Sequence, residues 1–247
     1  MTVRGRSKQI LGVIGGLGPL ATAGFYEQVV RMTDASSDQD HLQVMIHSHP
    51  EIPDRSRYIL DPDHAVSPVP ALIEAGRMLA ALGADRIAIP CITAHYFYDQ
   101  LSTALPIPVI HLVGETVRYL RNQSFEKIGL LATDGTVSSR LFQSAADEAG
   151  LAIVLPDAVH QQDLMNIIYD QVKAERPVDR QKLTEISGAL RQKGAQTIVL
   201  GCTELSVVQM RRTLGPGFHD AMGILARAAV IASGAALRDD HESLIVS

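Results

Sequence analysis

The chain has 247 residues, of which 46% are hydrophobic and 20% charged, and its formal net charge is -5. These values are typical of a folded globular protein and exclude a disordered chain or a membrane bundle. The acidic balance, without long runs of Lys or Arg, argues against a nucleic-acid or membrane partner and favours a small molecule. Two cysteines are too few to cross-link a chain of this length, so we interpret them as free thiols.

The first apolar segment, residues 10–25, has to be distinguished from a secretion signal, because three basic residues precede it: Arg4, Arg6 and Lys8. Several glycines and Pro19 interrupt the segment, so it predicts a buried strand that runs into a glycine turn. A second apolar segment, residues 221–237, contains Arg227 and is shorter than the ~20 apolar residues of a membrane span. We therefore expect a cytoplasmic protein without a membrane-spanning helix.

Short apolar runs alternate with amphipathic stretches along the chain, which predicts an α/β fold with mostly parallel sheets flanked by helices. Ligands of such sheets bind at the carboxyl ends of the strands, so the residues that follow each run are the candidates for a site. The expected strands are residues 10–14, 43–47, 86–89, 109–110, 127–132, 153–155 and 197–200, and the clearest helices are residues 68–82, 137–149, 161–174 and 179–193.

Two pairs of segments resemble each other across the chain. Residues 8–18 and 127–136 both enter a glycine turn, and residues 87–93 and 198–203 both end a strand at Pro-Cys or Gly-Cys. Self-similarity is common among α/β proteins and is the alternative explanation. We interpret the pattern as two pseudo-symmetric domains with the active site in the cleft between them. The predicted domains are residues 1–113 plus 212–247, and residues 114–211.

Cys91 and Cys202 each stand where a predicted strand gives way to a helix, a position whose free amides lower a thiol pKa. A single cysteine in such a place is more often buried and inert, but the matched contexts in both halves favour chemistry. Two thiols that face each other can remove a proton from one face of a carbon acid and return one to the other face, with no cofactor. Thr93 and Thr203 add hydroxyls that can bind a carboxylate or cap a helix.

The sequence signals for other kinds of binding site are weaker. Gly16, Gly18 and Ala21 form a G-x-G-x-x-A pattern, but no acidic residue stands about twenty positions later, so an anion-binding turn is favoured over a nicotinamide site. Arg55 follows the second strand, where it is either a carboxylate clamp or a solvated charge. Four metal donors are scattered through the first half and are more often structural: His47, His49, Cys91 and His95.

Taken together, the motifs resemble the aspartate/glutamate racemase family, specifically its aspartate-racemase branch. The resemblance spans nearly the whole chain and rests on six ordered motifs: GGLGPLAT at 15–22, IPDRSRYIL at 52–60, PCITAH at 90–95, LLATDGT at 130–136, IYDQVKAERP at 168–177 and GCTEL at 201–205. It implies two α/β domains that close over an acidic amino acid, a homodimer, and proton exchange at Cα without pyridoxal phosphate. Cys91 and Cys202 are then the catalytic acid/base pair.

The same resemblance implies which residues surround the substrate. Arg55 matches the position that binds the side-chain carboxylate, and Glu204 favours the aspartate branch, since glutamate racemases usually have histidine there. Ile92 departs from the family, which usually has asparagine at this position. The implied substrate-binding residues are Leu17, Gly18, Arg55, Ile92, Thr93, Thr133, Gly135, Thr136, Lys173, Thr203 and Glu204.

The leading hypothesis is a cofactor-independent racemase of aspartate or a related acidic amino acid, with neither a metal nor an organic cofactor. Ile92 replaces a polar contact with an apolar one. Two related activities therefore stand as alternatives: that of a maleate isomerase and that of an arylmalonate-decarboxylase-like enzyme. A non-catalytic protein that binds a small carboxylate in the same cleft is the third possibility. A nicotinamide-dependent enzyme is the most distant one.

Overall fold

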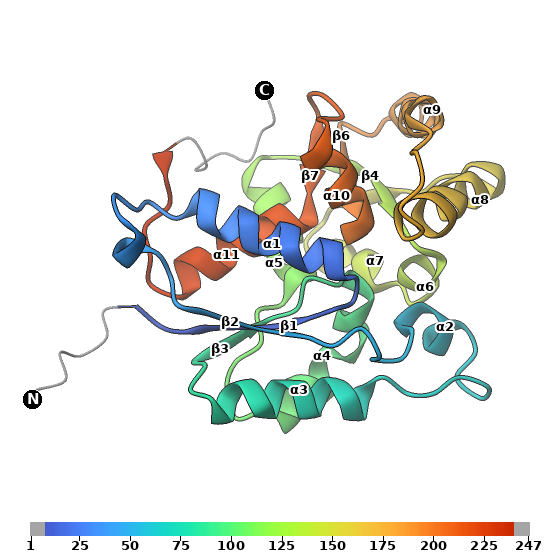
Figure 1. Ribbon diagram of the computed structural model, residues 1–247. Coiled ribbons are helices and arrows are strands. Elements are labelled where there is room, and N and C mark those ends of the chain that lie inside the picture. The colour runs from blue at the N-terminus through green and yellow to red at the C-terminus, as the bar shows by residue number, and fades with distance from the viewer. Residues whose placement is uncertain (1–7, 240–247) are drawn as a thin grey trace, which may run out of the picture.

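The computed structural model describes residues 8–239. Arg4 and Arg6 therefore lie outside the described residues, as does the end of the chain beyond position 239. Two parallel sheets stand side by side and helices pack on their faces (Figure 1). This is the α/β architecture that the alternating sequence pattern predicts.

The first sheet has three parallel strands in the order β2-β1-β3, where β1 is Leu11–Gly15, β2 is Val44–Ser48 and β3 is Arg86–Ala88. All five residues of β1 are buried, as expected for a central parallel strand that is covered on both faces. Helices α1 (Pro19–Met32) and α11 (Ala221–Ala232) lie side by side on one face of this sheet, and α3 (Val69–Ala81) covers the other (Figure 1).

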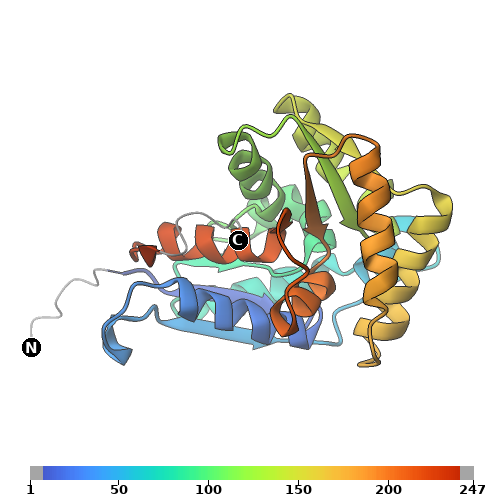
Figure 2. The ribbon, with the colours of Figure 1, turned by 90° about the horizontal axis from the view of Figure 1, so that it is seen from above.

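The second sheet has four parallel strands in the order β5-β4-β6-β7. Its members are β4 (Lys127–Ala132), β5 (Ala152–Val154), β6 (Thr197–Gly201) and β7 (Phe218–Asp220). Helices α8 (Ala158–Asn166) and α9 (Arg180–Gln192) lie next to each other beside this sheet (Figure 2), and α9 packs on β4 and β6. The sequence pattern did not predict β7.

The remaining helices connect these strands. Their bounds are η1 (Asp38–Asp40), α2 (Arg55–Leu60), α3 (Val69–Ala81), η2 (Ile92–Phe97), α4 (Tyr98–Ala104), α5 (Leu112–Asn122), α6 (Asp134–Ser138), α7 (Leu141–Glu148), α8 (Ala158–Asn166), η3 (Ile167–Val172), α9 (Arg180–Gln192) and α10 (Thr203–Arg211).

Capping residues explain several helix boundaries. Pro19 occupies the first turn of α1, where its missing N–H is not needed, and Gly18 is the N-cap. Asp179 accepts a hydrogen bond from the backbone N–H of Lys182 at the start of α9. Helices α3 and α9 accordingly lie where the sequence predicts them, within a residue of each predicted end.

Two predicted helices are each divided in the structure. The helix expected over residues 137–149 is interrupted because Arg140 adopts a left-handed backbone conformation with φ of 54°, which separates α6 from α7. The helix expected over residues 161–174 begins at Ala158 as α8 and changes into a π-helix, η3, at Ile167.

The strand expected at residues 109–110 is reduced to a single parallel bridge between Val109 and Ile87. Pro106 and Pro108 immediately precede it and cannot donate to a sheet, which limits the pairing. This bridge leads into α5, the first helix of the second half.

The two halves contact each other directly. Helix α2 of the first half packs on α6 of the second, and a Cβ built on Gly135 would come within 2.7 Å of Ser56 Oγ. The predicted domain division assigns residues 212–247 to the first domain. In the described part of this segment, β7 pairs with β6 of the second sheet, and α11 packs on α1 and α5. The domain boundaries at residues 113 and 211 stay a prediction. Within residues 8–239 no helix is long and apolar enough to cross a membrane.

Candidate active site

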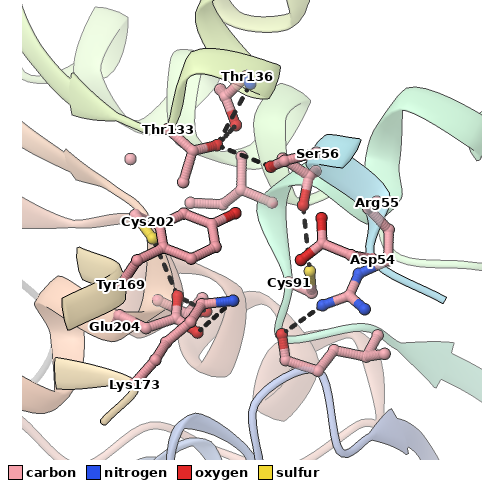
Figure 3. A pocket seen from close by; sticks show the side chains of 15 residues that line it. Asp54, Arg55, Ser56, Cys91, Thr133, Thr136, Tyr169, Lys173, Cys202 and Glu204 are labelled. Carbon is pink, nitrogen blue, oxygen red and sulfur yellow. Dashed lines mark hydrogen bonds and ion pairs between the residues drawn. The ribbon is translucent and has the colours of Figure 1, made fainter. Parts of the chain in front are cut away.

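The two cysteines occupy equivalent places in the two halves. Cys91 lies just beyond β3 and is the N-cap of η2, and Cys202 directly follows β6 and is the N-cap of α10. Both side chains are buried, and both line one cavity, called the inner cavity below, whose empty space is about 320 Å³ with open solvent included. Figure 3 shows the two sulfurs on opposite sides of this cavity. The structure thus brings together the two thiols that the sequence pattern pairs.

A chain of polar contacts surrounds Cys202. Its Sγ donates a hydrogen bond of 2.9 Å to Glu204 Oε2, and Glu204 Oε1 lies 3.7 Å from Lys173 Nζ. Burial raises the pKa of Cys202 well above its ordinary value, and the negative charge and hydrogen bond of Glu204 raise it further. The expectation that a helix N-terminus lowers the pKa is therefore wrong for Cys202, because burial and the neighbouring carboxylate outweigh the amides.

Lys173 is held between Glu204 and an aromatic ring. Its Nζ lies 4.7 Å from the centre of the Tyr169 ring, a cation–π contact. Burial opposes the ammonium charge, but Glu204 and then Tyr169 more than offset this effect and raise the pKa of Lys173. The lysine therefore stays cationic.

Cys91 has a hydroxyl and a guanidinium as neighbours. Its Sγ lies 3.4 Å from Thr93 Oγ1. Arg55 is buried with 7% of its surface exposed, and although burial opposes its charge, the adjacent Cys91 sulfur raises its pKa. The guanidinium donates to three backbone carbonyls, those of Leu17 (2.8 Å), Ile52 (3.2 Å) and Pro53 (3.1 Å). These bonds fix the position of Arg55 and leave about two of its five N–H groups for a ligand or for Cys91.

A row of hydroxyls crosses from one half to the other. Ser56 Oγ lies 3.3 Å from Thr133 Oγ1, which lies 3.2 Å from Thr136 Oγ1. Thr133 also caps α6 by accepting a hydrogen bond from the N–H of Thr136. Figure 3 places this row at the end of the cavity away from Lys173.

Most of the residues implied by the resemblance line the inner cavity, namely Leu17, Arg55, Cys91, Ile92, Thr93, Thr133, Thr136, Lys173, Cys202, Thr203 and Glu204. Gly18 lines an adjoining hollow, and Gly135 packs behind the hydroxyls against Ser56.

Four other lining residues were absent from the predicted set: Asp54, Ser56, Tyr169 and Gly201. All four fall within motifs that carry the resemblance, and that membership was the signal that could have identified them.

The four scattered metal donors do not converge. His47 and His49 lie on or just after β2 with ring centres 5.4 Å apart, whereas His95 is buried in η2 with its Nε2 3.1 Å from the carbonyl oxygen of Ile89. Among residues 8–239, no group of three or more His, Cys, Asp or Glu side chains is arranged to hold a metal ion.

Each half of the chain places a cysteine after a strand, and both cysteines line the inner cavity. The family model described as Asp/Glu/Hydantoin racemase matches residues 14–236. The chain therefore belongs to the Asp/Glu/hydantoin racemase family and is an amino-acid racemase, which makes it an isomerase.

Known relatives agree with this assignment. The chain is 28% identical over 204 residues to the broad specificity amino-acid racemase RacX of Bacillus subtilis, an alignment that covers 81% of this chain and 87% of the relative. The aspartate racemase of Picrophilus torridus superposes with a TM-score of 0.85 and 29% identity, over 94% of this chain and 97% of that one. Glutamate racemase RacE1 of Bacillus anthracis shares the fold, with a TM-score of 0.67, 17% identity, and coverage of 92% and 82%.

Proposed function

We propose that the chain interconverts the L- and D-enantiomers of aspartate, or of a related acidic amino acid, by proton transfer between Cα and two thiols. The observation that carries this proposal is that Cys91 and Cys202 line one cavity from opposite sides. A thiolate on one side takes the Cα proton, so that the C–H bond breaks and an S–H bond forms. The thiol on the other side then gives its proton to the opposite face of the carbanion. No cofactor takes part.

The surroundings of Cys202 determine its resting state in this proposal. The raised pKa of Cys202 keeps its proton on the sulfur, so Cys202 rests as the thiol. Glu204, which accepts the hydrogen bond of the Cys202 thiol, receives that proton when Cys202 has to act as the base.

The polar groups around the cavity match the charges of an amino acid. Lys173 and the free N–H groups of Arg55 bind carboxylates, and the hydroxyls of Thr93 and Thr203 stabilise the charge that develops during proton removal. The likeness to an aspartate racemase supports aspartate as the first substrate to test.

The direct test is proton NMR of L-aspartate in D2O, followed as loss of the Cα proton, together with a chiral assay of the product. The wild-type protein is expected to give both exchange and D-aspartate. Replacement of either cysteine (Cys91→Ala or Cys202→Ala) should lower racemisation by at least about 100-fold. Full racemisation by either folded variant would exclude the two-thiol mechanism.

A second candidate function is isomerisation or decarboxylation of a small dicarboxylate. It is favoured by Ile92, which is 3% exposed and lines the inner cavity with an apolar side chain. Turnover of maleate or of an arylmalonate, without exchange of amino-acid protons, would support it.

A carboxylate-binding protein without activity would instead be stabilised thermally by its ligand and catalyse no exchange. The homodimer and the cytoplasmic location stay predictions.

A further inference from the structure

Cys91 is carried into the inner cavity by a very short turn at the end of the first sheet. Strand β3 ends at Ala88, and the backbone N–H of Cys91 donates to the carbonyl oxygen of Ile89 at 2.8 Å. A hydrogen bond between residues two apart closes a γ-turn, and the ring of Pro90 fixes φ near the value that such a turn needs. The place of the thiol therefore depends on where the Ile89 carbonyl points.

The same carbonyl oxygen has a second donor. His95 lies in η2 with 2% of its surface exposed, and its Nε2 is 3.1 Å from the Ile89 oxygen. A carbonyl oxygen only accepts hydrogen bonds, so Nε2 has to carry the ring proton. The two lone pairs of this oxygen are thus used by the backbone N–H of Cys91 and by the ring of His95.

The hydrogen bond from His95 closes a loop of the chain around three cavity residues. The ring reaches from η2 back to the carbonyl of Ile89, at the point where the chain leaves the sheet. Between the two bonded residues lie Cys91, Ile92 and Thr93, and all three line the inner cavity. This one side-chain contact therefore helps to fix the position of all three relative to the sheet.

The His95 ring has a cost for the fold that an apolar side chain would not have. Its Nδ1 is buried and has no hydrogen-bond partner within residues 8–239. With the proton on Nε2, Nδ1 is a bare acceptor, and a buried acceptor without a partner destabilises a protein. Burial also lowers the pKa of His95 to about 3, so the ring is a neutral donor. The contact with Ile89 gives a reason, beyond packing, for a polar side chain here.

Cys202 has a comparable anchor in the second half. Ser206 stands four residues after Cys202, the same spacing as in the first half, and is fully buried in α10. Its hydroxyl donates to the carboxylate of Asp220 at the end of β7, the strand next to β6. In both halves, a buried polar side chain four residues after the cysteine thus ties the cysteine-bearing segment to its own sheet.

We propose that His95 is a positioning residue of the racemisation reaction, whose ring holds residues 89–95 so that the Cys91 thiol faces the substrate. His95 does not line the inner cavity and acts through the carbonyl of Ile89. This inference rests on the two-thiol function proposed above. It gives a role to a histidine that the sequence alone indicates only as a scattered metal donor.

The test measures kcat and KM for L-aspartate, by loss of the Cα proton in D2O and a chiral assay, in variants whose folding is checked by urea denaturation. His95→Leu removes the donor, and His95→Met does so with a more adaptable side chain. His95→Gln restores a donor, since a glutamine amide nitrogen can replace Nε2.

The matched control is His219→Leu. His219 is also 2% exposed and does not line the inner cavity. One of its ring nitrogens, Nε2, likewise has no hydrogen-bond partner in the described part of the chain, and the other lies 2.9 Å from Thr197 Oγ1. The control therefore removes an equally buried ring with one hydrogen bond, at a place remote from Cys91 in the second sheet.

Both apolar variants, His95→Leu and His95→Met, should lower kcat by about 100-fold, because a reacting group displaced by about 1 Å loses that much rate. KM should stay within about twofold, since Arg55 and Lys173, which bind the carboxylates in the proposed function, lie outside residues 89–95. His95→Gln should return kcat to within about fivefold of the wild-type value. His219→Leu should destabilise the fold and leave kcat within about twofold.

Each contrary result has a distinct meaning. An unchanged kcat in the apolar His95 variants would overturn the positioning role and leave the proposed function standing. Equal losses in His95→Leu and His95→Gln would also overturn it, because the restored donor would then have no effect. So would an equal loss in His219→Leu, which would assign the effect to a loosened fold. If folded, reduced wild-type protein exchanged no Cα proton of aspartate, the proposed function would fail, and the role of His95 with it.

Discussion

Cys202 is the N-cap of α10 and Glu204 lies in its first turn, and the thiol donates a hydrogen bond of 2.9 Å to Glu204 Oε2. Lys173 Nζ lies 3.7 Å from the other carboxylate oxygen and favours the thiolate, whereas Glu204 favours the thiol. Burial adds to the effect of Glu204 and is the largest cause of the raised pKa. The proton on Cys202 is thus controlled by two neighbours of opposite charge, each of which can be removed separately.

Replacing Glu204 by glutamine should lower the pKa of Cys202, because the negative charge that disfavours the thiolate is lost while burial persists. The measurement is a pH titration of thiolate ultraviolet absorbance in a Cys91→Ser background, where Cys202 is the one cysteine left of the two. In the otherwise wild-type protein, Glu204→Gln should also lower the racemisation rate about 100-fold, as expected for loss of a proton acceptor. An unchanged titration would show that Glu204 does not control this thiol.

Replacing Lys173 by methionine should raise the pKa of Cys202 further, since the lysine is the charge that favours the thiolate. The same titration in the Cys91→Ser background measures the change. KM for aspartate should rise by roughly tenfold, because a cation that binds carboxylate is lost. Lys193→Met is the control, since Lys193 lies at the end of α9 and does not line the inner cavity. A fall in the pKa of Cys202 would contradict the arrangement seen in Figure 3.

The central strands could be predicted from sequence because they are buried on both faces. β1 is a continuous apolar run, and β6 is one after its first residue, Thr197, which is typical of parallel strands under helices. Strand β7 could not be predicted this way, because it has three residues and the middle one is histidine. His219 is buried there and lies 2.9 Å from Thr197 Oγ1 through its Nδ1, a partner that becomes adjacent only in the folded chain.

The residues of the candidate site likewise divide into those that could be placed from the sequence and those that could not. Cys91, Cys202 and Thr133 follow strands, so their position at one edge of the sheets could be predicted. Tyr169 could not be placed, because it lies in the π-helix η3. An apolar pattern with the period of an α-helix does not show where the helix changes to the wider turn of a π-helix.

Replacing Gly135 by alanine should destabilise the protein by about 1–3 kcal/mol, because the new Cβ would lie within 2.8 Å of the Ser56 side chain and backbone. The overlap should also push α2 away from α6, so the racemisation rate is expected to fall. Gly188→Ala is the matched control, since no atom lies within 4 Å of its Cβ and it stands inside α9. That variant should be stabilised by up to ~1 kcal/mol. Urea denaturation measures both changes, and equal stabilities would contradict the close packing of α2 on α6.

His95 should make the stability of the fold sensitive to acid. Its ring is fully buried near His111 and Tyr98, and its Nε2 donates to the carbonyl of Ile89 at 3.1 Å. Burial, and to a lesser extent His111, lowers the pKa of His95 to about 3, against 6.5 in an unfolded chain. Between these two values the unfolded chain binds a proton that the folded chain does not. The stabilising effect is therefore complete above pH 6.5 and is lost as the pH falls toward 3.

The variant His95→Gln keeps a donor for the Ile89 carbonyl and removes the titrating ring. Between neutral pH and about pH 4.5, the wild-type protein should lose about 2–3 kcal/mol more unfolding free energy than this variant. Urea denaturation at both pH values gives the difference. His64→Gln, which removes a histidine with 80% of its side chain exposed, should lose as much stability as the wild type. If His95→Gln lost stability to the same extent as the wild type, His95 would already be protonated in the folded protein at that pH.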